Sequence, residues 1–431
     1  MASSLTTALA VTTPVADIPP RPVTDGEHGG LLRALTEIPD PRDPRGVRYP
    51  LAGLLTVAVC AVLAGASSFA AITDWLHDLD EQAQDRLGFE RGVPVGTTVW
   101  RLLTRLDADL LTTVLAGWLR TRARPVTPQP KRYRTVIAVD GKTLRGARRP
   151  DGGQVHLLSA LDTSTGIVLA QVTVAAKSNE IPAFTPLLNA VETVLGSLAG
   201  LLVIADALHT QTAHAHEIAA RGAHLMIPAK GNQPTLFAQL KALPWPQIPA
   251  GDRTRDRGHG RAETRTVKAI TVHTPGGIAF PHAQQAVRIT RTTSSGKTSR
   301  ETAYLTVSLP AADAQPADLQ HWARLEWHIE NRVHHVRDVT FREDLHQART
   351  GTGPAVIATL RNTAIGYHRT NGDTNIRPRH PTRQPPPTRP HHRRDQPLPD
   401  NAMTLCFTRR GNCAAPSDID GPVFILPSSE A

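Results

Sequence analysis

Two aspartates in this sequence each follow directly after a short apolar run. Asp140 ends the run in VIAVDGK, and Asp206 ends the run in LLVIADA. A short apolar run that is followed directly by a carboxylate predicts a buried strand with an acid at its end. A carboxylate there is poorly solvated unless a cation or hydrogen bonds satisfy it. Asp140 taken alone is equally compatible with a residue that caps a turn.

A third acid is available from a long helix predicted near the C-terminal end of the ordered sequence. The apolar stripe of this helix consists of Trp322, Leu325, Ile329, Val333 and Val336. Glu326, Glu330, His334 and Arg337 share a polar face of the same helix. By periodicity, Glu326 and Glu330 are equal candidates for a metal-binding acid. Without the two aspartates, an ordinary solvated face would be the better interpretation.

The predicted elements around the aspartates indicate an α/β fold. Strands are predicted at residues 136–139, 155–161 and 167–174, followed by a helix, a strand at 201–207, a helix, a strand at 225–227 and a helix. This order is typical of the ribonuclease H-like mixed sheet, whose first three strands form an antiparallel meander. The first and fourth strands are neighbours in that fold, so Asp140 and Asp206 would lie at adjacent strand ends. Two such carboxylates repel each other unless divalent cations lie between them, which favours metal binding over turn formation.

A change of pattern at residues 244–312 predicts a β insertion in this core. Three strands are expected there, at residues 263–272, 286–292 and 302–309. The stretch RDRGHGRAETR adds a basic edge that could contact phosphate. A solvated loop explains the same stretch equally well.

The region before the core is predicted to be a small all-α domain at residues 29–124, joined to the core by a linker at 125–132. Residues 1–28 are rich in Ala, Thr and Pro and are expected to be disordered. Residues 51–73 carry no charge, but the Gly65–Ser68 break favours two buried helices over a membrane span. A helix around residues 98–105 would expose Arg101, Thr104 and Arg105, either for a DNA groove or simply to solvent.

Composition sets weaker limits on function. The formal charge of the 431 residues is +10, but residues 377–410 hold eight Arg and two acids, which leaves 10 − 6 = +4 elsewhere. The excess is therefore only weak evidence for a nucleic-acid partner. The three cysteines allow no disulfide framework and fit a reducing cytoplasm. No secretory signal is recognisable at the N-terminus.

Several ordered motifs resemble the DDE transposases of bacterial insertion sequences of the ISAs type. The resemblance covers residues 31–376 and is carried by IAVDGKTLRGA, HLLSALDTSTGIVLAQ, KSNEIPAFTPLL, IADALHTQ, KGNQPTL, HGRAETR and HWARLEWHIENRVHHVRDVTFRED. It implies a catalytic and metal-binding triad of Asp140, Asp206 and Glu330, choosing Glu330 over Glu326. It also implies two Mg²⁺ ions, for which Mn²⁺ can substitute, and no small-molecule cofactor.

The implied activity is cleavage and transfer of DNA strands at the ends of the protein's own element, by a dimer on DNA and not at a membrane. The side chains expected to contact DNA are Lys142, Arg145, Lys230, Asn232, Arg261, Arg265 and Arg337. Simple surface charge is the alternative for each of them.

The resemblance ends at Ile376. Residues 377–431 form an irregular tail rich in Pro and Arg, which suggests either a reading-frame shift or a basic DNA-binding arm. The main alternative function is therefore an inactive relic transposase that at most binds DNA. A different nuclease on the same fold is a second rival. A zinc hydrolase using His209, His214 and His216 is a third, disfavoured because neighbouring positions i and i+2 lie on different helix faces.

Overall fold

The computed structural model describes residues 25–123, 134–149, 152–175, 179–258, 260–272, 278–295, 297–373 and 375–376. The predicted linker at 125–132, the tail at 377–431 and nearly all of the predicted N-terminal extension lie outside these ranges.

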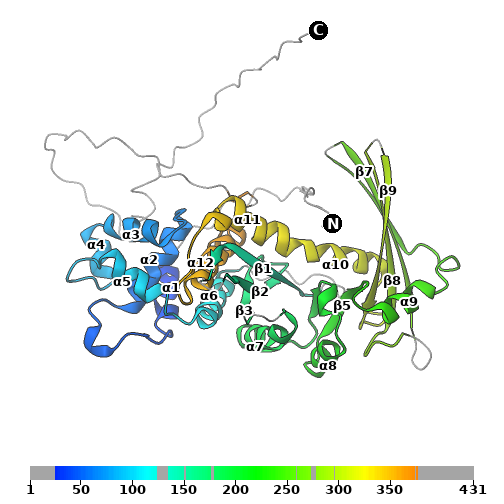
Figure 1. The fold of residues 1–431 in the computed structure, drawn as a ribbon, viewed down its shortest axis with the longest axis horizontal. Coiled ribbons are helices and arrows are strands. Elements are labelled where there is room, and N and C mark those ends of the chain that lie inside the picture. Colours follow the sequence, from blue (N-terminus) through cyan, green and yellow to red (C-terminus); the bar gives the residue numbers. More distant parts are fainter. Residues whose placement is uncertain are drawn as a thin grey trace, which may run out of the picture.

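The centre of the molecule is the ribonuclease H-like mixed sheet that the sequence predicts (Figure 1). Its strands are β1 (Val136–Arg148), β2 (Gln154–Asp162), β3 (Val168–Thr173), β4 (Leu202–Ala205) and β5 (His224–Ala229). They lie in the order β3-β2-β1-β4-β5, with β1, β2 and β3 antiparallel and β4 and β5 parallel to β1. The predicted pairing of the first and fourth strands is confirmed.

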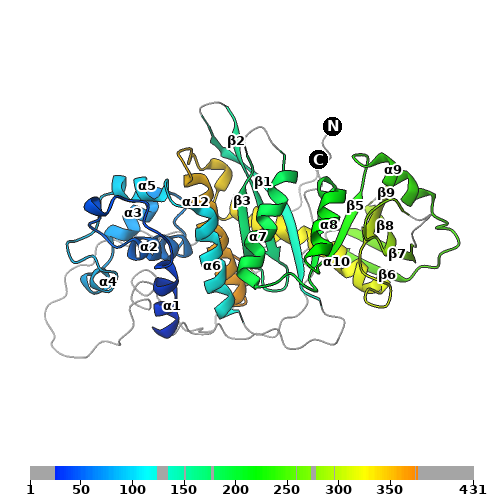
Figure 2. The ribbon, with the colours of Figure 1, turned by 90° about the horizontal axis from the view of Figure 1, so that it is seen from below.

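Helices cover both faces of this sheet. On one face, α7 (Phe184–Leu195) packs on β2 and β3, and α8 (Thr212–Ala220) packs on β5. On the other, α10 (Pro316–Ile329) crosses β1 and β4, as Figures 1 and 2 show. The strands are apolar on both sides for this reason, and every residue of β4 is buried.

The first strand is longer than predicted. The sequence indicates that it ends at Asp140, but β1 continues to Arg148 and pairs with β2 on both sides of Asp140. Pairing with β4 does stop at Val139. Asp140 therefore lies at the point where β1 stops pairing with β4 and continues in a hairpin with β2. The prediction that the strand ends at Asp140 was wrong, but Asp140 does lie where the parallel pairing of the first and fourth strands ends.

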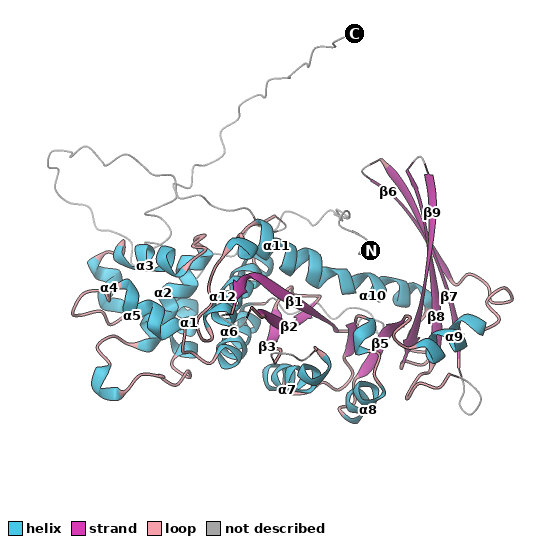
Figure 3. Ribbon diagram, in the orientation of Figure 1, coloured by secondary structure: helices cyan, strands magenta, loops and turns pink. Residues whose placement is uncertain are grey.

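The insertion extends the sheet to nine strands. Its members are β6 (Asp252–Gly258), β7 (Arg261–Thr271), β8 (Gln285–Ser295) and β9 (Lys297–Val307), and β9 pairs antiparallel with β5. Successive antiparallel hairpins link the four strands into a ribbon that projects from one end of the molecule (Figure 3). Three of these strands were predicted. The fourth, β6, was missed because its sequence DRTRDRG has no apolar residue. The helix α9 (Pro234–Ala242) precedes the insertion.

The N-terminal region is helical, as predicted. It contains α1 (Asp25–Leu35), α2 (Leu51–Leu63), α3 (Phe69–His77), α4 (Glu81–Arg86), α5 (Gly96–Leu103) and α6 (Ala108–Arg122). The predicted break between two helices is found at Gly65, whose φ is 101°, and α2 is buried along nearly its whole length. The second helix, α3, is only partly buried, with Ile72 and Leu76 facing the core. Within the described residues, no helix is both long and apolar enough to cross a bilayer.

The helical region and the sheet share one hydrophobic core. The helix α12 (Gly353–Thr370) contacts α2 and α6 on one side and β3 on the other, and all residues from Gly353 to Tyr367 are buried. Figure 2 shows α6 and α12 lying together between the N-terminal helices and the strands. The two predicted domains are therefore joined by extensive packing.

The predicted long helix is interrupted. After α10 the backbone makes a π-helical turn, η4 (Glu330–His334), and continues as α11 (His335–Val339). In this turn the N–H of His335 donates to the carbonyl of Glu330, one residue further than in an α-helix. Such turns often occur at functional sites. Short 3₁₀ turns complete the fold at η1 (Pro44–Gly46), η2 (Ile181–Ala183), η3 (Ala207–His209) and η5 (Glu343–Leu345).

Candidate metal centre

The register of the sheet brings the two aspartates to the same edge. Val139 of β1 is paired in parallel with Ala205 of β4, and the next residue on each strand is an aspartate. Asp206 also caps the following 3₁₀ turn, since its Oδ1 accepts the N–H of Leu208 at 2.9 Å. Turn capping and placement at the site are thus compatible, because that contact leaves the second carboxylate oxygen available.

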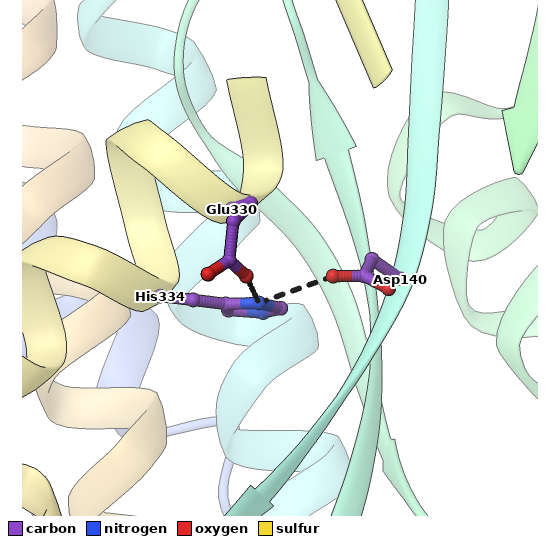
Figure 4. Close-up of side chains that lie close together, drawn as sticks. All are labelled: Asp140, Glu330 and His334. Carbon is purple, nitrogen blue, oxygen red and sulfur yellow. Dashed lines mark hydrogen bonds and ion pairs between the residues drawn. The ribbon is translucent and has the colours of Figure 1, made fainter. Parts of the chain in front are cut away.

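The π-helical turn places Glu330 and His334 opposite Asp140 (Figure 4). Nδ1 of His334 lies 3.2 Å from Oε2 of Glu330 and 3.3 Å from Oδ2 of Asp140. Among the described residues, these three side chains form the group that could hold a metal ion, with one ligand atom from each lying within 4.8 Å of the others. Asp140 and Glu330 are partly exposed, whereas His334 is buried, so the group opens to solvent on its acidic side.

His334 is a member of this centre that sequence reasoning did not identify. Burial lowers the pKa of His334, but the carboxylates of Asp140 and Glu330 outweigh burial and raise it above the ordinary value. The imidazolium thus compensates the two carboxylates. Its position on the polar face with Glu330 was visible in the sequence, but the π turn that directs both side chains to one point was not.

Glu326 lies one turn before Glu330 and belongs to the same electrostatic environment. Burial is the main cause that raises the pKa of Glu326 to about 7, and the charges of Asp206 and Asp140 raise it further against the charge of Lys230. Glu326 is therefore close enough to sense both aspartates, while Glu330 is joined to Asp140 through His334. Both glutamates that helical periodicity selects are therefore near the aspartates. They differ in that Glu330 contacts His334, which also contacts Asp140.

The donor set suits a divalent cation. Carboxylate oxygens are the ligands that Mg²⁺ and Mn²⁺ prefer, and Mg²⁺ needs few protein ligands because it retains several waters. Asp140 and Glu330 offer such oxygens within 4.8 Å of each other. Asp206 stands on the neighbouring strand. Asp140 and Glu330 therefore suit a divalent cation, while Asp206 is not one of the three residues whose ligand atoms converge.

Another acidic residue, Glu180, makes contacts close to the segments that carry the aspartates. Glu180 lies between two histidines: Nε2 of His156 is 2.8 Å from its Oε1, and Nε2 of His209 is 3.3 Å from its Oε2. His156 belongs to β2, opposite the continuation of β1 after Asp140, and His209 lies in the turn after Asp206. Burial raises the pKa of Glu180, but the two histidines outweigh burial and lower it to about 2. Glu180 therefore links β2, the antiparallel partner of β1, to the turn that follows Asp206.

The side chains expected to contact DNA differ in their accessibility. Lys142 is largely buried, and its Nζ lies 2.6 Å from Oδ2 of Asp338. Arg145 is well exposed and only 3.7 Å from Asp344. Lys230 and Asn232 are exposed in the loop after β5, where the Asn232 side chain donates to the carbonyl of Ala207. This last contact ties the loop to the turn that follows Asp206.

Three of the expected DNA contacts need correction, and one of them is Lys142, whose side chain is only 10% exposed and ion-paired with Asp338. Arg337 is completely buried, with its guanidinium 2.8 Å from Glu343. Arg265 is bound by Glu263 at 2.6 Å and has a side-chain exposure of only 16%. None of these three cations is presented to solvent as a free phosphate contact. Arg261, at the tip of the β6–β7 hairpin, is exposed.

The buried charge at Arg337 has a structural explanation. Glu343 accepts hydrogen bonds from both Arg337 and Arg361, at 2.8 Å each, and all three side chains are at most 2% exposed. Burial raises the pKa of Glu343, but the charges of the two arginines outweigh burial and lower it to about 2. This triad joins α11, η5 and α12 behind the metal centre.

Of the three histidines considered for zinc, His209 and His214 stack on each other with ring centroids 5.4 Å apart, but His216 does not join them. His209 contacts Glu180, and His214 stacks on the ring of Phe184 at 4.1 Å. His216 is exposed and lies beside His282. The zinc hydrolase interpretation therefore has no support from the geometry.

Two known families match consecutive regions of this chain. Residues 132–365 match the family described as "Transposase DDE domain", and residues 32–119 match the one described as "DDE_Tnp_1-associated". The first match covers more than half of the chain, so the protein belongs to this DDE transposase family.

Curated relatives carry the same class of name. A putative transposase, YncI, of Escherichia coli O157:H7 is 29% identical over 79% of this chain and 87% of its own length. A protein called H repeat-associated putative transposase YhhI, of Escherichia coli K12, is 27% identical over 78% of this chain and 89% of its own. Among solved structures, the piggyBac transposase synaptic complex with hairpin DNA covers 81% of this chain and 73% of its own, at 11% identity and a TM-score of 0.35. That structural similarity is too weak to support any detail.

Proposed function

We propose that this protein is the transposase of a bacterial insertion sequence of the ISAs type, which binds the ends of its element and catalyses divalent-metal-dependent DNA cleavage and strand transfer. Asp140, Asp206 and Glu330 are the proposed catalytic and metal-binding residues, with Mg²⁺ as the natural ion and Mn²⁺ as a substitute. The observation that carries the proposal is the parallel pairing of β1 and β4, which places both aspartates at one edge beneath the helix that holds Glu330.

The residues divide the work between ligation and positioning. When bound, divalent cations supply the activation of water or of a DNA 3′-hydroxyl and the stabilisation of the leaving oxygen. The three acids hold the cations, and no side chain has to act as a covalent nucleophile. His334 orients Asp140 and Glu330 from the buried side of the centre. Glu180 holds β2 and the turn after Asp206 together through His156 and His209.

Glu330 is proposed as the third acid in preference to Glu326. The exposed side chain of Glu330 faces Asp140 across His334, so its carboxylate can share an ion that also contacts DNA. Glu326 is half-buried, and its raised pKa disfavours the charged form that a metal ligand needs. Arg145, Lys230, Asn232 and Arg261 remain proposed DNA contacts because each is exposed.

Paired ends require two active sites, so the active species is proposed to be a dimer on DNA, acting on chromosomal DNA in the bacterial cytoplasm. The test uses the purified full chain and a duplex carrying the sequences that flank its gene. Cleavage at the ends of inverted repeats with Mg²⁺, followed by joining of the freed 3′ ends to a second duplex, is the expected result. Binding without cleavage by the full chain would indicate the inactive relic instead, and hydrolysis without joining would indicate a nuclease.

A further inference from the structure

The β6–β9 ribbon has two faces with opposite electrostatic character. Residues that are paired across antiparallel strands lie on the same face of the sheet. The rows that begin with Arg253, Arg255 and Arg257 therefore form one face, and the rows that begin with Asp252, Thr254 and Asp256 form the other. We call the first the arginine–threonine face. Its members are Arg253, Thr266, Thr290, Thr302, Arg255, Thr264, Thr292, Arg300, Arg257, Ala262, Ser294 and Thr298.

All carboxylates in these rows lie on the opposite face, and all have partners. Asp252 accepts a hydrogen bond from Gln320, and Asp256 is paired with Arg324, both residues of α10. Glu263 is paired with Arg265 and Arg291, and Glu301 lies near Arg291. This face is thus the one that packs toward α10, and its charges are balanced.

The arginine–threonine face contains four arginines and no acid. Arg253, Arg255, Arg257 and Arg300 are exposed and form no ion pair with any residue in the described part of the chain. Only the base of this side of the ribbon is covered, where Trp245 packs against Arg288 and accepts a hydrogen bond from Lys268. The upper rows are open, and they present hydroxyl groups between the guanidinium groups.

The spacing of the arginines suits a nucleic-acid backbone. Arg253, Arg255 and Arg257 alternate along an edge strand, so the Cα atoms of successive arginines are about 6.7 Å apart, close to the rise of two phosphates along one DNA strand. Arginine and threonine side chains are common donors to DNA phosphates. A charged edge strand can also serve only to prevent sheet-to-sheet aggregation. That role would be met by charges of either sign, and it does not account for Arg300, which lies on β9, separated from the edge strand β6 by β7 and β8.

We infer that the arginine–threonine face binds the phosphate backbone of duplex DNA, and that the rows beginning with Asp252, Thr254 and Asp256 on the opposite face do not. The inference rests on the proposed function, because DNA is the proposed substrate, but it assigns a surface remote in the sequence from the acids. It also replaces Arg265 with Arg253, Arg255, Arg257 and Arg300 as the contacts that the insertion supplies. Because the ribbon is joined to α10 and β5, DNA held there has a fixed relation to the metal centre.

The sharpest test compares two variants that add the same charge one residue apart. T298E/T302E adds two carboxylates to the arginine–threonine face, and S299E/A303E adds two to the opposite face of the same strand; all four positions are exposed. Binding to a random-sequence duplex of about 40 base pairs is measured by fluorescence anisotropy across a salt series. T298E/T302E is expected to weaken binding by about tenfold or more at low salt, and S299E/A303E by less than about threefold.

A second set of variants removes the positive charge. R253Q/R255Q/R257Q should weaken binding and make the salt dependence shallower by about 2.7 in logarithmic slope, which is about 0.9 for each lost contact. R253K/R255K/R257K should retain most of the affinity. Circular dichroism and thermal unfolding confirm that each variant is folded.

Three results would overturn the inference: equal binding by the two glutamate pairs, full affinity in the glutamine triple variant, or no DNA binding by the parent chain. The proposed function is tested separately by cleavage. A parent that cleaves element ends, with face variants that bind normally, would remove this surface and leave the transposase assignment. A parent that binds DNA through this face but cleaves nothing would support the binding surface and remove the transposase assignment.

Discussion

Nδ1 of His334 lies 3.3 Å from Oδ2 of Asp140, although the two residues are almost two hundred positions apart in the chain. The contact exists because β1 and the π-helical turn meet at the edge of the sheet where β4 also ends. The same histidine nitrogen contacts Glu330. The buried side chain of His334 thus links Asp140 on the strand to Glu330 on the helix. This link can be tested directly by mutation.

The role of His334 can be tested through metal affinity. His334→Ala is expected to raise the Mg²⁺ concentration for half-maximal DNA cleavage by about 10–100-fold, because the carboxylates lose the group that orients them. High Mg²⁺ should recover most of the rate. His335→Ala removes the neighbouring exposed histidine and should leave the Mg²⁺ requirement unchanged. An unaltered requirement in His334→Ala would show that the contact has no part in metal binding.

The choice between the two glutamates leads to a second prediction. Asp140→Asn, Asp206→Asn and Glu330→Gln should each reduce cleavage by more than about a hundredfold, the upper end of the effect of losing an indirect ligand contact. DNA binding should be largely retained in each. Glu326→Gln should keep most of the activity. If Glu326→Gln is inactive and Glu330→Gln is active, Glu326 is the third acid.

Gly141, which follows Asp140, has no space for a side chain. A Cβ at this position would clash with Oε1 of Glu180 and lie only 2.7 Å from Nε2 of His156. Gly141→Ala should therefore displace Glu180 or the strand, and reduce both the thermal stability and the cleavage rate. Gly231→Ala is the matched control, because nothing lies within 4 Å of its added Cβ. Normal activity and stability in Gly141→Ala would mean that the Glu180 contact is readily rearranged.

The buried triad of Arg337, Glu343 and Arg361 predicts a large loss of stability without Glu343. Glu343→Gln leaves two buried guanidinium groups without a counter-charge and should cost about 3–5 kcal/mol in the free energy of unfolding. Glu90→Gln, at an exposed acid, should change it by less than about 0.5 kcal/mol. Urea denaturation of the two variants measures the difference, and a loss below about 1 kcal/mol at Glu343 would contradict the predicted coupling.

Stability should also depend on pH through Glu343. Its pKa of about 2 in the folded protein lies below its ordinary value of 4.5. The stabilisation by this group is therefore fully present above about pH 4.5 and is lost as pH falls from there towards 2. The parent should lose more stability over this interval than Glu343→Gln does. Parallel acid titration curves for the two proteins would exclude the effect.

The central features of the site could be predicted because they depend on local patterns. Two apolar runs that each end in aspartate, separated by the right order of strands and helices, predict the pairing of β1 with β4. This pairing could be predicted because a parallel strand that is buried on both faces consists almost entirely of apolar residues. The two candidate glutamates followed from helical periodicity in the same way.

What the sequence could not predict depends on long-range packing. No local pattern marks the π turn, so the convergence of His334 with Asp140 was not visible. Arg337 has the same helical spacing as an exposed cation, and its burial depends on Glu343 and Arg361, which come from later elements. The strand β6 was missed because its two faces are both polar, one directed to α10 and the other to solvent.

The position of α12 has a consequence for how the protein is made. This helix fills the space between the N-terminal helices and β3, yet it is the last helix of the described chain. During synthesis, α2, α6 and β3 all leave the ribosome well before their shared partner is translated. Until then the apolar faces that α12 covers remain exposed, which is the condition in which incomplete chains aggregate, so this shared core can be completed only after the segment has been translated.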